Sequence, residues 1–176
     1  MKKLITLLVV LSTFITYAFS QKIITTGSFG ALEGQQRVKM YIDFSEADIM
    51  GMEEDDFAAY EENYVRYKVE IVANFYSYAN EALRGKLLVG NYKQETEYTL
   101  NVIVHSVSAK GDYSCDLILS HDNGDIAKAE GIFCKGGKFG SKLNLMKDGA
   151  EHTGAFIGFF LKKQIEKAEK EKKIRR

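Results

Sequence analysis

One apolar stripe with helical spacing constrains the fold of this chain more than any other feature. Apolar side chains recur at steps of three and four over residues 57–82, the repeat of one face of a helix. Acidic residues 53–56 precede the stripe, where negative charge complements the helix dipole, and Gly85 is a typical residue just beyond a helix end. The pattern predicts one long helix over about residues 54–84. The stripe consists of Phe57, Tyr60, Tyr64, Tyr67, Ile71, Phe75, Ala79 and Ala82.

Alternating apolar and polar residues predict strands on both sides of this helix. The expected strands are residues 22–26, 38–44, 98–104, 113–119 and 126–133. Between the last two, Asn123-Gly124 is a strong signal for a hairpin turn. The sequence therefore predicts a short β-meander that follows the long helix.

A second apolar stripe predicts a C-terminal helix over about residues 150–172, after a glycine-rich connection. Gly154 and Gly158 within it are expected to permit close packing on the sheet or on the first helix. Two helices on one face of a sheet bury both stripes economically. We therefore predict an α+β fold with two layers, a mainly antiparallel sheet of about 4–6 strands and both helices packed on one face. A single domain is expected over residues 21–161, with a basic helix end at 162–176.

The first twenty residues have the layout of a secretory signal peptide. Lys2 and Lys3 precede an apolar run, and Ala18-Phe19-Ser20 places small residues at the −3 and −1 positions of a cut before Gln21. No cysteine lies near the cut, which argues against a lipid anchor. No later apolar run approaches the roughly 18–20 residues that span a bilayer. We expect an exported, soluble product in the periplasm or cell envelope, with no transmembrane span after cleavage.

Charge is distributed unevenly along the predicted mature chain. Residues 21–161 carry seven more acidic than basic residues, whereas residues 162–176 carry eight basic and three acidic residues. An acidic body argues against a nucleic-acid partner, which requires a basic face on the folded domain. The alternation of Lys and Glu in the tail favours a solvated helix end, and contact with anionic lipid or an acidic partner stays open.

The glycine-rich connection, residues 136–149, is the stretch that first suggests a binding site. Its spacing does not fit a P-loop, because Phe139 follows Gly137-Lys138 and the order of Ser141 and Lys142 is reversed. A structural turn is favoured over an anion site at the start of the last helix, where Asp148 and Glu151 are expected. The candidate interaction segment consists of Gly136, Gly137, Lys138, Phe139, Gly140, Ser141, Asn144 and Asp148.

No pattern in the sequence predicts a catalytic set, a cofactor site or a metal site. The three histidines, His105, His121 and His152, share no metal-ligand spacing, and the acidic residues between 45 and 62 do not fit a calcium loop. The G-x-S-x-G motif of a nucleophile elbow is also missing. Polar hairpin residues are expected to face water. They include Asp112, Asp116 and Asp122.

The two cysteines, Cys115 and Cys134, lie in strands that are expected to pair. If Leu117 and Leu119 share a buried face with Ala129, Gly131 and Phe133, Cys115 lies opposite Phe133, Leu117 lies opposite Gly131, and the two cysteines point to opposite faces of the sheet. A register shifted by one residue would set the cysteines directly opposite each other, but it would place Lys128 and Glu130 beside the leucines, so burial favours the first register. This register predicts two separate thiols, and a β-bulge would change it.

Three motifs resemble a family of small exported proteins of Gram-negative bacteria. They are Ile42-Asp43-Phe44-Ser45-Glu46-Ala47 with Gly51-Met52-Glu53-Glu54-Asp55-Asp56-Phe57, then Lys135-Gly136-Gly137-Lys138-Phe139-Gly140-Ser141, then Asn144-Leu145-Met146-Lys147-Asp148-Gly149. The resemblance covers most of the chain after residue 20. It implies a strand and a long helix before an antiparallel hairpin, the GGxFGS…NLMxDG segment and a closing helix, and it assigns no functional residue. The element order is also similar to periplasmic envelope modules such as the amino-terminal domain of TolB.

These inferences favour a non-enzymatic, envelope-associated module that binds an unknown envelope protein. One alternative is an enzyme with its site near residues 136–152, where Asp148, Glu151 and His152 supply titratable groups. Another alternative is a small-ligand site between the tyrosine-rich helix and the sheet, although the tyrosines of the stripe are expected in the core.

Overall fold

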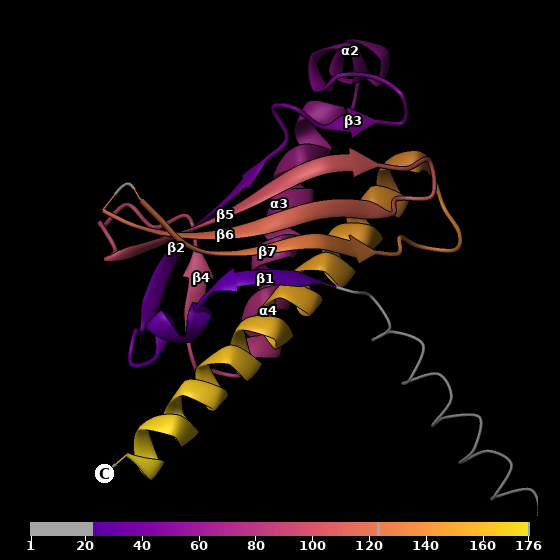
Figure 1. Cartoon of the computed structure of the whole chain (residues 1–176). Coiled ribbons are helices and arrows are strands. Elements are labelled where there is room, and N and C mark those ends of the chain that lie inside the picture. The colour runs from indigo at the N-terminus through magenta and orange to yellow at the C-terminus, as the bar shows by residue number, and fades with distance from the viewer. Residues whose placement is uncertain (1–22, 123, 176) are drawn as a thin grey trace, which may run out of the picture.

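The computed structural model describes residues 23–122 and 124–175, and the predicted signal peptide lies outside these residues (Figure 1). The fold is α+β, as predicted. Its elements are β1 (Ile24–Gly27), the 3₁₀ helix η1 (Phe29–Leu32), β2 (Arg37–Asp43), β3 (Asp48–Ile49), α2 (Glu54–Tyr60), α3 (Tyr64–Leu83), β4 (Leu88–Gly90), β5 (Tyr98–Val107), β6 (Tyr113–His121), β7 (Gly124–Cys134) and α4 (Lys142–Ile174).

The strands form one sheet in the order β1-β7-β6-β5-β2-β4, and β3 pairs with β5 beside this path. The four strands from β1 to β5 in this order pair antiparallel, whereas β2 runs parallel to β5 and to β4. All five predicted strands are present. The sequence did not predict β3 and β4, because runs of two and three residues are too short to show alternation.

Helices α3 and α4 cover one face of the sheet and pack along each other (Figure 1). Two glycines of α4 bring the helices close together: a Cβ on Gly154 would lie 3.0 Å from Cα of Phe75, and one on Gly158 would lie 2.9 Å from Cα of Ala79. The G-x-x-x-G spacing therefore serves helix packing. Among the described residues, no helix combines the length and apolar character needed to cross a membrane.

The predicted helix over residues 54–84 is broken into α2 and α3. Glu61 leaves the helical conformation, with φ −109° and ψ 91°, and Asn63 is the N-cap of the second helix. The side chains still pack across the break: the ring of Tyr64 meets Phe57 edge-on at 5.1 Å, and its hydroxyl donates to Glu54 at 2.7 Å. Phe57 and Tyr64 are both buried and are seven residues apart, which is about two turns of a helix. The sequence pattern therefore looks like that of one continuous helix.

Helix α4 begins eight residues before its predicted start. Ser141 is the N-cap, and its side chain accepts a hydrogen bond from the backbone N–H of Asn144 at 3.3 Å. Leu143 and Met146 are buried, so the apolar stripe starts within the glycine-rich connection. Asp148 consequently lies inside the helix, and the expectation that it marks the start was wrong.

The predicted pairing of β6 with β7 was wrong. The partner of Cys115 lies one residue before the predicted Phe133, and the partner of Leu117 lies two residues before the predicted Gly131. Cys115 pairs with Ile132, whereas Leu117 pairs with Ala129, and a bulge at Gly131, with φ 76°, absorbs the difference. Both cysteines therefore point to the buried face, as diagonal neighbours with free thiols. Burial raises the pKa of both thiols, that of Cys134 to about 11.

Candidate functional site

The candidate interaction segment connects β7 to α4, and its first part is an internal junction. The backbone N–H of Gly136 donates to Asp112 at 2.8 Å. The second carboxylate oxygen of Asp112 accepts from the Ser108 hydroxyl at 3.0 Å. Asp112 therefore joins the β5–β6 turn to the segment, and the expectation that it simply faces water was wrong.

Glycines permit the close contacts of this junction. A Cβ on Gly136 would overlap the carbonyl oxygen of Lys110, and one on Gly137 would overlap the carboxylate of Asp148. Gly111 and Gly149 pack against backbone atoms of α4 and of the β5–β6 turn in the same way. Much of the GGxFGS…NLMxDG pattern is therefore explained by packing between a loop, a turn and the start of a helix.

The middle of the segment is exposed, and it includes the large apolar side chain of Phe139, of which 89% is exposed. Phe139 lies between Lys138 and Gly140, three residues before Lys142 at the start of α4. Lys142 in turn lies over the ring of Tyr60, with its Nζ 5.0 Å from the ring centroid. Tyr60, the last residue of α2, is 59% exposed, so the prediction that it lies in the core was wrong. We use the name Phe139 surface for Lys138, Phe139 and Lys142, which are near neighbours in the chain, together with Tyr60, which Lys142 contacts.

A shallow pocket adjoins this surface. It has a volume of about 350 Å³ and lies between the α2–α3 junction and the start of α4. Arg66, Tyr67, Ser141 and Lys142 are among its lining residues. Tyr67 is half-buried and lies beneath the Nζ of Lys147, at 5.5 Å from the ring centroid. Aromatic rings and cations thus gather where α4 meets the α2–α3 junction.

The three residues of the enzyme alternative have separate structural partners. Asp148 packs against Gly137, and Nδ1 of His152 bonds the carbonyl of Lys135 at 2.7 Å. Glu151 turns to α3 instead, where it accepts a hydrogen bond from Asn74 at 3.1 Å. These contacts hold α4 to its neighbours and assign none of the three residues a role in chemistry.

A polar cluster on the helix-free face of the sheet was not predicted, and the expectation that Asp116 faces water was wrong. Asp116 is 8% exposed, and its carboxylate accepts from the N–H of Gly131 at 3.0 Å and lies 3.2 Å from Nε2 of His105. Nζ of Lys128 lies 3.3 Å from the same carboxylate. Burial raises the pKa of Asp116, but the hydrogen bonds from Gly131, His105 and Lys128 bring it below its usual value. Gly131 in the middle of a strand was the one available signal, because such glycines often mark bulges.

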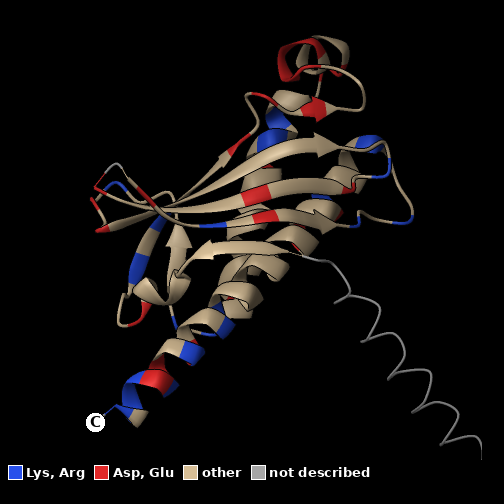
Figure 2. Ribbon diagram, viewed as in Figure 1, with Lys and Arg blue, Asp and Glu red and all other residues tan. Residues whose placement is uncertain are grey.

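Metal ligation has no support in the side-chain arrangement. Within residues 23–122 and 124–175, no group of three or more His, Cys, Asp and Glu side chains could hold a metal ion. The acidic residues before and along α2 gather on one end of the molecule (Figure 2). One of them, Glu54, forms an ion pair with Lys68, with 2.6 Å between the carboxylate oxygen and Nζ.

Comparison with known proteins gives only distant structural likenesses. No family model and no curated protein matches the chain. One similar solved structure is the dodecamer of a PelC variant from Paraburkholderia phytofirmans, with a TM-score of 0.43 and 15% identity, covering 80% of this chain and 96% of that one. Another is the crystal structure of an uncharacterized protein, with a TM-score of 0.39 and 16% identity, covering 72% of this chain and 91% of that one.

Proposed function

We propose that this chain is a non-enzymatic module of the periplasm or cell envelope that binds a protein partner through the Phe139 surface. The observation that carries the proposal is the 89% exposure of Phe139 on a loop that begins with two closely packed glycines, Gly136 and Gly137. Aromatic side chains near the centre of an interface are frequent hot spots of binding energy. An exposed phenylalanine also has no folding role that would explain its position.

The anchoring of the loop supports this proposal. The hydrogen bond from Gly136 to Asp112 and the one between His152 and the carbonyl of Lys135 fix the start of the loop, and the N-cap Ser141 ends it at α4. A partner that binds a fixed loop loses little conformational entropy on association. Tyr60, which lies beneath the Nζ of Lys142, supplies a second exposed aromatic ring, and tyrosine is a residue type enriched at protein interfaces.

Site-specific photocrosslinking tests the proposal. A photoreactive phenylalanine analogue at position 139, in cells that export the chain, should give one discrete adduct with an envelope protein. The matched control places the same analogue at Phe133, which is 48% exposed on strand β7. Equal labelling from both positions, or no protein adduct from position 139, would contradict the proposal.

The partner identified by crosslinking then allows a quantitative test. Phe139→Ala should weaken its binding about thirtyfold or more, the effect expected of a hot-spot residue. Phe133→Ala should leave the dissociation constant unchanged. Because Phe139 is exposed, its replacement should not alter the denaturant midpoint, so a loss of binding is not a loss of folding.

A further inference from the structure

The C-terminal end of α4 extends past the body of the domain (Figure 1). Ile165 is the last buried residue of the helix, and no described residue after it is buried. The helix has 33 residues, which corresponds to a length of about 50 Å at 1.5 Å per residue. Its last turns are therefore available to contact something other than this domain.

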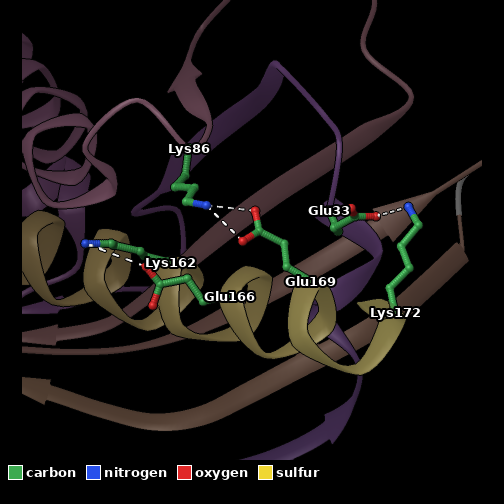
Figure 3. A network of polar contacts seen from close by, with 6 residues as sticks. All are labelled: Glu33, Lys86, Lys162, Glu166, Glu169 and Lys172. Atoms are coloured by element: carbon green, nitrogen blue, oxygen red, sulfur yellow. Dashed lines mark hydrogen bonds and ion pairs between the residues drawn. The ribbon is translucent and has the colours of Figure 1, made fainter. Parts of the chain in front are cut away.

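One side of this end is fixed to the body by ion pairs (Figure 3). Glu169 accepts two bonds of 2.8 Å from Lys86, and Lys172 contacts Glu33 at 2.8 Å. A third pair, Lys162 with Glu166 at 3.8 Å, lies along the helix itself. Two acidic residues of the helix end are thus engaged by lysines, and Ile165 is buried close to them in the helix.

The opposite side carries a stripe of lysines between two apolar residues. Phe159, Lys163, Lys167, Lys170 and Ile174 follow one another at steps of three and four, and all are exposed. The exposed fraction is 38% for Phe159 and 85% for Ile174. Nζ of Lys163 lies over the Phe159 ring at 4.5 Å, and the pair of Lys167 with Glu171 is long, at 4.0 Å. We call these five residues the lysine stripe.

We propose that the lysine stripe docks on the surface of a bilayer that contains anionic phospholipid. Charge complementarity supports this occupant: each lysine near such a surface contributes to attraction, and its long stem can lie along the apolar boundary. Phe159 and Ile174 at the two ends distinguish this surface from one for nucleic acid or for an acidic protein, since aromatic and aliphatic residues beside lysines suit the membrane interface. The stripe spans 15 helical steps, about 22 Å along a nearly straight line, which matches a flat partner.

Vesicle flotation tests the proposal. The chain from Gln21, which contains every described element, should float with vesicles of phosphatidylglycerol and phosphatidylethanolamine and not with phosphatidylcholine vesicles. The triple variant K163Q/K167Q/K170Q should bind the anionic vesicles about a hundredfold more weakly, the effect of three interfacial charges. The control K93Q/K110Q/K135Q removes the same charge from exposed positions elsewhere and should bind as the parent does.

The apolar ends of the stripe separate a bilayer from other anionic partners. Ile174→Ala should weaken vesicle binding severalfold, because an inserted apolar side chain would be lost. Unchanged binding by this variant, together with full displacement by soluble polyglutamate or duplex DNA, would assign the stripe to charge alone and overturn the proposal. Equal binding by the triple variant and its control, with circular dichroism showing both folded, would also overturn it.

Discussion

The two parts of α4 belong to one continuous helix but have opposite relations to the rest of the protein. The first part, residues 142–161, is rich in small residues and contributes nine buried positions to the interface with α3 and the sheet. The second part, residues 162–174, contributes Ile165 alone to the buried positions and meets the body through the close approach of Ala168 to Gly30 and through two ion pairs. The difference shows that burial in the first part stabilises the fold, whereas the second part leaves one face available for binding.

Gly158→Val should be among the most destabilising single substitutions in α4. The valine side chain would overlap the backbone of Ala79 in α3, and two packed helix backbones cannot separate without loss of other contacts. We expect a loss of about 3 kcal/mol or more in the free energy of unfolding, measured by urea denaturation. Lys167→Val introduces the same side chain in the second part and should cost less than about 1 kcal/mol. Equal effects of the two variants would abolish the distinction between the parts.

A matched pair of isoleucines tests where burial along α4 ends. Ile165 is 2% exposed and Ile174 is 85% exposed. Ile165→Ala should destabilise the protein by about 2 to 3 kcal/mol through lost burial and a cavity, whereas Ile174→Ala should stay within about 0.5 kcal/mol. Chemical denaturation of both variants is the measurement. A large effect at Ile174 would show that the helix end packs on the domain.

The sequence predicted the regular elements well because their burial repeats. Five strands and both helix stripes follow from side chains that alternate or recur with helical spacing, and these repeats do not depend on distant contacts. The break between α2 and α3 escaped prediction because Phe57 and Tyr64 keep helical spacing across it. The start of α4 escaped prediction because its N-cap, Ser141, lies within a glycine-rich stretch that resembles a loop.

Ser141→Ala tests that N-cap directly. Loss of the hydrogen bond from the N–H of Asn144 to Ser141 should lower the free energy of unfolding by about 1 kcal/mol. Ser77→Ala, at an exposed position inside α3, makes the same chemical change and should be neutral or slightly stabilising, since alanine favours a helix interior. An equal, neutral result at both positions would mean that the first part of α4 begins later than Ser141.

The candidate site was less predictable than the fold, because its residues meet through irregular backbone. Asp116 becomes buried and hydrogen-bonded only through the bulge at Gly131, which also reverses the predicted facing of the cysteines. The segment containing Phe139 was identified from its composition. The sequence did not show which residues of this segment pack and which are exposed. Its first glycine packs against the β5–β6 turn, which lies more than twenty residues earlier in the sequence.

The smallest predicted effect concerns the ion pair that fixes the second part of α4. The hydrogen bond from Lys86 holds the pKa of the Glu169 carboxyl below its usual value, so the folded state binds a proton there less readily than the unfolded chain. The stabilisation is therefore present at neutral pH and is lost as the pH falls through the pKa of the folded state. Glu169→Gln should lower the denaturant midpoint slightly at pH 7 and have no effect near about pH 2, where both chains are neutral at this position. Salt should reduce the difference at pH 7, since both partners are partly exposed. A difference that persists unchanged in acid would mean that Glu169 holds the helix end through packing of its side chain, and the second part of α4 would then resemble the first.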